Sequence, residues 1–194
     1  MFKLLIPILF AAAVITVAYI NVPLCIKVVA GLVVYILFLP AGLLTKWRLD
    51  RRFPLAFLIY FLTLVAAGFV AYVFAPIGEE YRKITEAQRQ FFTEAYRCPG
   101  GFFILTIQAL LLAPLVEEII FRGILFEELK RLGLPTAYIL SSLIFALLHW
   151  PGLGALPIFI MALGLAYIYQ KFGLPASVLV HFLQNSLAQL AEVS

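Results

Sequence analysis

The sequence predicts an all-α protein, a multi-pass transmembrane helical bundle of about seven spans with one amphipathic helix on the membrane interface. Composition is the first evidence: 64% of the 194 residues are hydrophobic and 12% are charged, about half the charged share of a soluble domain. The apolar residues also form runs long enough to cross a bilayer. Finally, the polar residues are concentrated between these runs, above all in residues 77–99.

Each expected span is an apolar run bounded by turn residues or charges. Asn21 and Pro23 separate the first two runs, and a basic loop at residues 45–52 follows the second. The run that begins at residue 136 is short, so we expect its end to lie within the protein. The seven runs cover residues 4–20, 24–44, 53–74, 102–129, 136–150, 156–169 and 176–190.

Residues 77–99 differ from all the apolar runs. Four glutamates balance four basic residues there, and Phe91, Phe92 and Tyr96 recur at helical spacing. This pattern is typical of a helix that lies on a membrane surface. We therefore expect one membrane-embedded domain, residues 1–194, in three parts: a three-span part at 1–76, the interfacial helix at 77–99 and a four-helix core at 100–194.

The distribution of basic residues predicts the orientation. With alternating spans, eight lysines and arginines fall on the side of the N-terminus and four on the other side. Basic residues are enriched in cytoplasmic loops, so we expect a cytoplasmic N-terminus. The formal net charge of +4 is too small to suggest nucleic acid as a partner.

The fourth run contains charges that are expensive at membrane depth. Glu117, Glu118 and Arg122 lie inside a stretch that is otherwise apolar from residue 102 to 125. Intramembrane charges of this kind indicate a functional site. Glu118 and Arg122 are four residues apart and can pair on one helix face. Glu117 points about 100° away, and a poorly solvated carboxylate of this kind suits general-base catalysis.

Three further polar residues lie in apolar runs. The two histidines of the chain are His149 and His181, and Asn185 follows His181 by one helical turn. Taken singly, each could be structural, because a buried histidine or asparagine often bonds a carbonyl of a neighbouring helix. Taken together with Glu117 they indicate one cavity, because helices joined by short turns are usually neighbours.

These residues carry a resemblance to a known family. Glu117-Glu118-x-x-x-Arg122, Phe145-x-x-x-His149 and His181-x-x-x-Asn185 resemble, in order and spacing, the three motifs of the CAAX-processing and bacteriocin-immunity membrane proteases. This family is also called the Abi or type II CAAX prenyl endopeptidase family. The resemblance spans residues 102–190.

The resemblance implies an intramembrane endopeptidase of the glutamate type. In such a site Glu117 is the general base, His149 holds and polarises the water, and His181 and Asn185 form the oxyanion hole. Glu118 and Arg122 support the geometry. The implied partners are a protein or peptide substrate and the lipid bilayer, and we expect a prokaryotic cell (inner) membrane protein.

Several alternatives remain open on the sequence. A zinc protease could use Glu117 and the two histidines, but His-Glu-x-x-His is absent and asparagine is a poor zinc ligand, so we favour a mechanism without a cofactor. A non-catalytic peptide-binding or immunity protein would use the same cavity. A proton-coupled transporter would show an inverted repeat, and none is visible.

The two cysteines lie on one side of the predicted topology. Cys25 begins the second span and Cys98 precedes the fourth, so both are expected on the outer face. A disulfide requires α-carbons a few ångströms apart, and sequence does not supply that distance. The sequence alone therefore favours two unpaired thiols.

Overall fold

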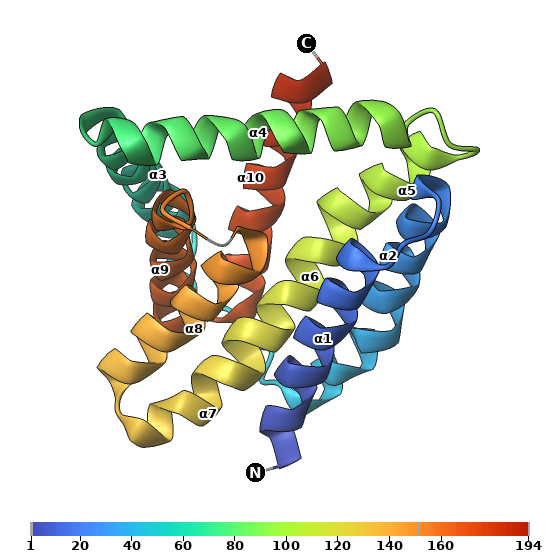
Figure 1. The fold of residues 1–194 in the computed structure, drawn as a ribbon. Coiled ribbons are helices and arrows are strands. Elements are labelled where there is room, and N and C mark those ends of the chain that lie inside the picture. Colours follow the sequence, from blue (N-terminus) through green and yellow to red (C-terminus); the bar gives the residue numbers. More distant parts are fainter. Residues whose placement is uncertain (1, 151, 194) are drawn as a thin grey trace.

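The structure, a computed structural model, describes residues 2–150 and 152–193 as a helical bundle (Figure 1). Within these ranges no residue belongs to a strand. One helix, α4, runs across the end of the bundle opposite the N-terminus. The principal helices are α1 (Leu5–Tyr19), α2 (Leu24–Phe38), α3 (Leu55–Val73), α4 (Ala75–Ala95), α8 (Leu134–His149), α9 (Ala155–Phe172) and α10 (Leu174–Val193).

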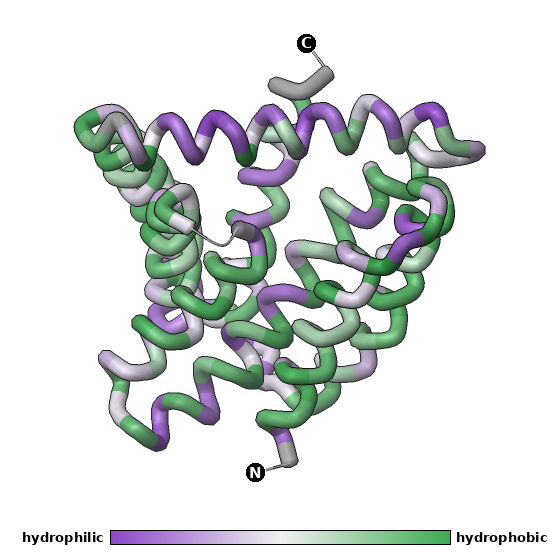
Figure 2. Tube along the Cα trace, in the orientation of Figure 1, coloured by the Kyte–Doolittle hydropathy of each residue, from purple (hydrophilic) through white to green (hydrophobic). Residues whose placement is uncertain are grey.

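The helices of the bundle have the character of membrane spans. Four are long and apolar enough to cross a bilayer: Leu24–Leu44, Leu55–Val73, Gly101–Leu132 and Ala155–Phe172. Helices α1 and α8 are apolar but shorter. The all-helical membrane fold is thus supported, whereas the expected count of about seven spans is not confirmed. Figure 2 shows hydrophobic residues along the bundle helices and many hydrophilic residues along α4.

The longest helical segment, Gly101–Leu132, is not a uniform α-helix. Two stretches have π-helical hydrogen bonding, which the sequence pattern did not predict. In chain order the segment consists of α5 (Gly101–Ile107), the π-helix η3 (Gln108–Leu112), α6 (Ala113–Glu118), the π-helix η4 (Ile119–Phe126), α7 (Glu127–Leu129) and the 3₁₀ turn η5 (Lys130–Leu132).

Helix α9 packs against α3, α8 and α10. Small residues make this close packing possible. A Cβ added at Gly164 would lie 2.7 Å from two side-chain atoms of Thr63 on α3, and Ala162 and Ala166 are fully buried. Small residues are what helices need for close approach where lipid offers little hydrophobic driving force.

Helix α4 is the amphipathic helix expected at residues 77–99, although it begins at Ala75 and ends at Ala95. Ile77 and Ile84 are buried. The backbone N–H of Gly154, just before α9, donates to the Glu80 carboxylate over 3.2 Å. The helix is therefore fastened to the bundle on its apolar face and exposes its charged residues.

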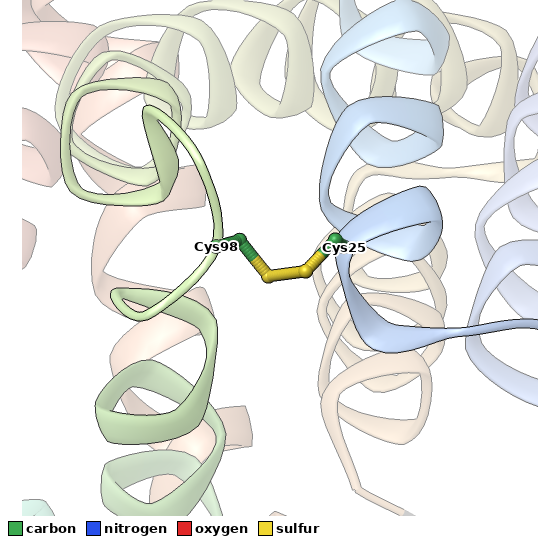
Figure 3. Close-up of a disulfide and its surroundings, with 2 residues drawn as sticks. All are labelled: Cys25 and Cys98. Atoms are coloured by element: carbon green, nitrogen blue, oxygen red, sulfur yellow. A yellow bond between two sulfur atoms is a disulfide. The ribbon is translucent and has the colours of Figure 1, made fainter.

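A disulfide joins the end of this helix to α2. Cys25 and Cys98 are bonded, with their α-carbons 5.4 Å apart (Figure 3). The expectation of two unpaired thiols was therefore wrong. Pairing requires the segment after α4 to lie beside the start of α2. This is a tertiary contact, and the local sequence carries no signal for it.

Candidate active site

Helix α6 presents the Glu-Glu-Arg motif between the two π-helical segments. Pro114 lies in its first turn and has no N–H to donate to the carbonyl of Leu110, so the α-helical bonding pattern is interrupted there. Short π-helical segments occur often at functional sites, because they redirect side chains relative to a regular helix. Here they flank Glu117 and Glu118 on both sides.

Glu118 and Arg122 form the buried ion pair that their spacing predicted. Arg122 Nε lies 3.4 Å from Glu118 Oε2, and both side chains are completely buried. Arg122 also donates through Nη2 to the carbonyl of Ala162 on α9 over 3.3 Å, and its guanidinium carbon lies 4.8 Å from the centre of the Phe145 ring on α8. One arginine thereby connects the motif helix with α8 and α9.

Glu117 faces away from this pair, as the helical geometry predicted, and three helices supply its neighbours. The Tyr35 hydroxyl on α2 donates to Glu117 Oε1 over 2.6 Å. The other oxygen, Oε2, lies 3.8 Å from His149 Nε2 and 3.9 Å from His181 Nε2. These two distances exceed a direct hydrogen bond and suit contacts bridged by water.

The contact that each histidine makes through Nδ1 determines whether its Nε2 can accept a hydrogen bond. His149 Nδ1 lies 2.8 Å from the carbonyl oxygen of Phe145, which can only accept, so Nδ1 carries the hydrogen. His181 Nδ1 lies 3.2 Å from Glu118 Oε1, and a carboxylate paired with Arg122 likewise accepts. In a neutral ring each Nε2 is then a hydrogen-bond acceptor directed towards Glu117.

Asn185 lies one turn beyond His181 on α10 and lines the same cavity. Its Nδ2 donates to the carbonyl of Ala109 in η3 over 2.9 Å. An amide carries two donor hydrogens, so one remains for a ligand in the cavity. The bond to η3 holds the side chain in one orientation.

These residues open into a cavity of about 710 Å³ between α4 and the bundle. Glu117, His149, His181 and Asn185 all line it. The two histidines beside Glu117 differ in exposure: 40% of the His149 side chain is exposed, against 4% of the His181 side chain. The site therefore has a buried side towards α10 and an open side towards α8.

Helix α4 forms the roof of this cavity, with polar and apolar side chains among those that line it. Tyr81, Thr85 and Arg89 are among its lining residues. Burial raises the pKa of the Tyr81 phenol, so this group stays a neutral hydrogen-bond donor at physiological pH. A second, mostly apolar cavity of about 410 Å³ lies between α1, α2 and α5, and Phe91, Leu105 and Gln108 line both.

Sequence reasoning missed Tyr35. It lies in the middle of an apolar run, where tyrosine is an ordinary packing residue, and it is 82 positions from Glu117. Phe145, in contrast, was visible as part of the second motif. In the structure its ring contacts the Arg122 guanidinium and lies 4.3 Å, centre to centre, from the His149 ring.

Residues 99–187 match the family model described as Type II CAAX prenyl endopeptidase Rce1-like. Residues 99–187 are a Rce1-like region. The searches of curated proteins and of solved structures gave no match.

The Rce1-like match bears out the recognition made from the three motifs, all of which fall inside it. This family consists of proteases, whose substrates are proteins or peptides. The Rce1-like region begins just after α4 and includes α5 to α8, α9 and most of α10. Tyr35 and the roof helix lie outside it.

Metal ligands were weighed from the sequence as a less favoured alternative. Among the described residues, no group of three or more histidine, cysteine, aspartate or glutamate side chains has the geometry to hold a metal ion. The other polar groups near Glu117 are Asn185, Tyr35 and the buried Glu118–Arg122 pair. The absence of a cofactor stays a prediction.

Proposed function

We propose that the protein is an intramembrane endopeptidase that hydrolyses a peptide bond with a water activated by Glu117. One observation carries the proposal: Glu117 Oε2 lies within 3.9 Å of the Nε2 atoms of His149 and His181, inside a cavity that a helical membrane bundle encloses. A carboxylate and two imidazoles around one point can hold and deprotonate a water.

In the proposed reaction Glu117 takes a proton from the water, and the resulting hydroxide attacks the substrate carbonyl carbon. His149 accepts the second water hydrogen and orients the oxygen lone pair. Tyr35, by donating to Oε1, keeps Oε2 as the oxygen that faces the water. The proton on Glu117 then passes to the departing amine nitrogen.

The developing oxyanion needs donors on the opposite side of the carbonyl. Asn185 has one free amide hydrogen, and His181 can donate from Nε2 when its ring carries both protons. The carboxylates of Glu117 and Glu118 flank that ring and balance its charge. Donors held in place before the reaction can supply several kcal/mol of transition-state stabilisation.

We further propose seven spans with the N-terminus in the cytoplasm of a prokaryotic cell. This topology puts α4 and the cavity at the outer face of the cell membrane, where Cys25 and Cys98 meet an oxidising compartment. A substrate tail would enter beneath α4, and its apolar part would occupy the cavity between α1 and α2. Its remaining contacts would be with the lipid bilayer, and nucleic acid plays no part.

The decisive test follows oxygen from water into product. Purified protein is incubated with membrane-anchored peptides in water enriched in ¹⁸O, and mass spectrometry detects new carboxyl ends that carry the heavy isotope. Glu117→Gln should abolish these products with little effect on folding, because the shape is kept. His149→Ala and His181→Ala should each lower the rate at least about a hundredfold.

Three outcomes would contradict the proposal. Unchanged cleavage by Glu117→Gln would remove this residue as the base. A complete loss of wild-type cleavage with a chelator, followed by recovery with zinc, would replace the proposed chemistry by a metal mechanism on the same residues. Tight peptide binding without any labelled product would favour the non-catalytic alternative.

A further inference from the structure

A third cavity, of about 520 Å³, lies at the end of the bundle where the N-terminus is found, opposite α4 (Figure 1). Its walls come from Lys3, from the loop after α2, from residues 127–131 and from the turn between α9 and α10. None of its described lining residues lines the catalytic cavity. It is a separate site, and the proposed proteolysis does not use it.

The acidic residues of this basic cavity are already paired. Glu127 lies 3.1 Å from Lys130 Nζ and also accepts a hydrogen bond from the Tyr169 hydroxyl over 3.0 Å. Glu128 lies 3.0 Å from Arg131 Nη1. Five basic residues line the cavity. The charges of Glu127 and Glu128 therefore neutralise those of two of them, Lys130 and Arg131.

Three cations remain in the basic cavity. Lys3, Lys46 and Arg48 line it, and within residues 2–150 and 152–193 none of them has an ion-pair partner. Lys3 Nζ donates only to the backbone carbonyl of Leu44, over 3.4 Å. Three positive charges around one cavity attract an anion with several oxygens, such as a phosphate.

The loop that carries two of these cations is held firmly. The Trp47 indole N–H donates to the Gly42 carbonyl over 3.0 Å, and the Asp50 N–H donates to the Phe172 carbonyl over 2.9 Å. Gly173 has φ +93°, and a Cβ there would collide with the carbonyl of Arg48. The loop therefore lies directly against the α9–α10 turn, which keeps Lys46 and Arg48 beside the cavity.

Exposed apolar residues are adjacent in sequence to residues that line the same cavity. Leu43, Leu44, Trp47 and Leu132 are exposed, Leu43 at 88%, and Leu44 itself lines the cavity. Tryptophan is enriched at the level of lipid headgroups. A cation cluster beside exposed leucines and a tryptophan matches a ligand that joins a phosphate to acyl chains.

We infer that this basic cavity binds the phosphate of an anionic phospholipid from the adjoining leaflet, with Lys46 and Arg48 as the principal contacts. The phosphate oxygens accept from these two side chains and from Lys3. The acyl chains lie along Leu43, Leu44 and Trp47. This lipid site is separate from the protease proposal and does not depend on it.

Trp47 allows a direct test, because the chain has only two tryptophans. In a Trp150→Phe background, Trp47 is the remaining tryptophan, and lipids with brominated acyl chains quench its fluorescence when they bind nearby. Brominated phosphatidylglycerol, which is anionic, and brominated phosphatidylcholine, which is zwitterionic, are titrated separately into protein in detergent micelles. We expect the anionic lipid to quench at a much lower mole fraction. Lys46→Gln/Arg48→Gln should weaken this preference about 30-fold, since each basic residue near a lipid surface contributes roughly a fivefold factor.

A matched control removes the same charge elsewhere on this face. Arg51 and Lys171 lie on neighbouring segments but do not line the basic cavity, so Arg51→Gln/Lys171→Gln should leave most of the preference intact. An equal loss in both double variants would overturn the site and leave only a diffuse basic surface. Native mass spectrometry of retained phosphatidylglycerol, in chains that keep both tryptophans, repeats the test without the background substitution.

The source of the phosphate is tested by competition. Glycerol phosphate at millimolar concentration, without acyl chains, should displace little of the brominated lipid. If it displaces the lipid completely at micromolar concentration, the cavity is a site for a free phosphate compound and the lipid assignment is wrong. Equal quenching by the anionic and zwitterionic lipids in the wild-type chain would overturn the proposal altogether.

Discussion

The two halves of the bundle differ in what their helices face. In the second span, Leu24–Leu44, 6% of the most apolar window is buried inside the protein, whereas in Ala155–Phe172 the share is 61%. Of these two, the more apolar helix is the more exposed one. In water this order would be reversed, because exposed apolar surface is unfavourable there.

The difference shows which solvent each half is built for. Helices α2 and α3 present leucine, isoleucine, valine and phenylalanine side chains outward, as a lipid-facing surface requires. The buried helices carry the small and polar residues instead, because the protein interior can satisfy them and lipid cannot. The proposed chemistry accordingly lies on the less apolar helices, with Tyr35 as the one side chain that α2 contributes to it.

The largest expected effect of this difference is at Arg122. Arg122→Ala leaves the Glu118 carboxylate buried without its cation and should lower the free energy of unfolding by about 3–5 kcal/mol. Arg131→Ala removes an arginine whose side chain is 70% exposed and should cost less than about 1 kcal/mol. Circular dichroism during titration with SDS in mixed micelles measures both.

A double variant sharpens this prediction. Glu118→Gln/Arg122→Met removes both charges and should regain part of the stability lost in Arg122→Ala. If Arg122→Ala unfolds like the wild-type chain but does not cleave peptide, Arg122 acts in the chemistry and not in the fold.

The disulfide should have the next largest effect. Cys25 and Cys98 are 73 positions apart, and on the chain-entropy model a bond across a loop of that length contributes about 4 kcal/mol. Cys25→Ser/Cys98→Ser should lower the unfolding midpoint to that of reduced wild-type protein. Reductant should have no further effect on the variant. Equal midpoints for oxidised and reduced wild-type protein would contradict this prediction.

A pair of glycines compares the buried and lipid-facing helices directly. Gly164→Ala forces a Cβ to 2.7 Å from Thr63, whose hydroxyl is held by a bond to the Tyr60 carbonyl, and should cost about 1–3 kcal/mol. At Gly68 an added Cβ meets nothing within 4 Å. Gly68→Ala should therefore stabilise α3 by about 0.5–1 kcal/mol. Destabilisation of similar size at both positions would mean that α3 packs more tightly than its exposure indicates.

The smallest expected effect on the fold is at Tyr35, where only the cleavage rate should change. Tyr35→Phe removes the donor to Glu117 but keeps the ring, and should lower the cleavage rate about 10- to 150-fold, since a bond to a charged group contributes about 1.5–3 kcal/mol. The loss should appear in kcat more than in KM, with an unchanged unfolding midpoint. Tyr72→Phe on the exposed surface of α3 is the matched control. Equal rates for the two variants would reduce Tyr35 to a packing residue.

Much of the candidate site could be predicted because its signals are local. Glu118 and Arg122 pair across one helical turn, and Glu117 points away from them, as the residue spacing requires. The amphipathic pattern of residues 77–99 located α4 to within a few residues. The π-helical segments were not predicted, because the apolar periodicity that indicates a helix does not distinguish α-helical from π-helical hydrogen bonding.

The sequence by itself determined the class of the protein, the motif residues and their local pairing, because composition, hydrophobic runs and helical spacing act over a few residues. The tertiary structure decided which distant side chains meet: Tyr35 with Glu117, Cys25 with Cys98, and Lys46 and Arg48 beside the α9–α10 turn. These contacts join positions far apart in the chain. They depend on how whole helices pack, and helix packing is the sum of many weak contacts that no single stretch of sequence records.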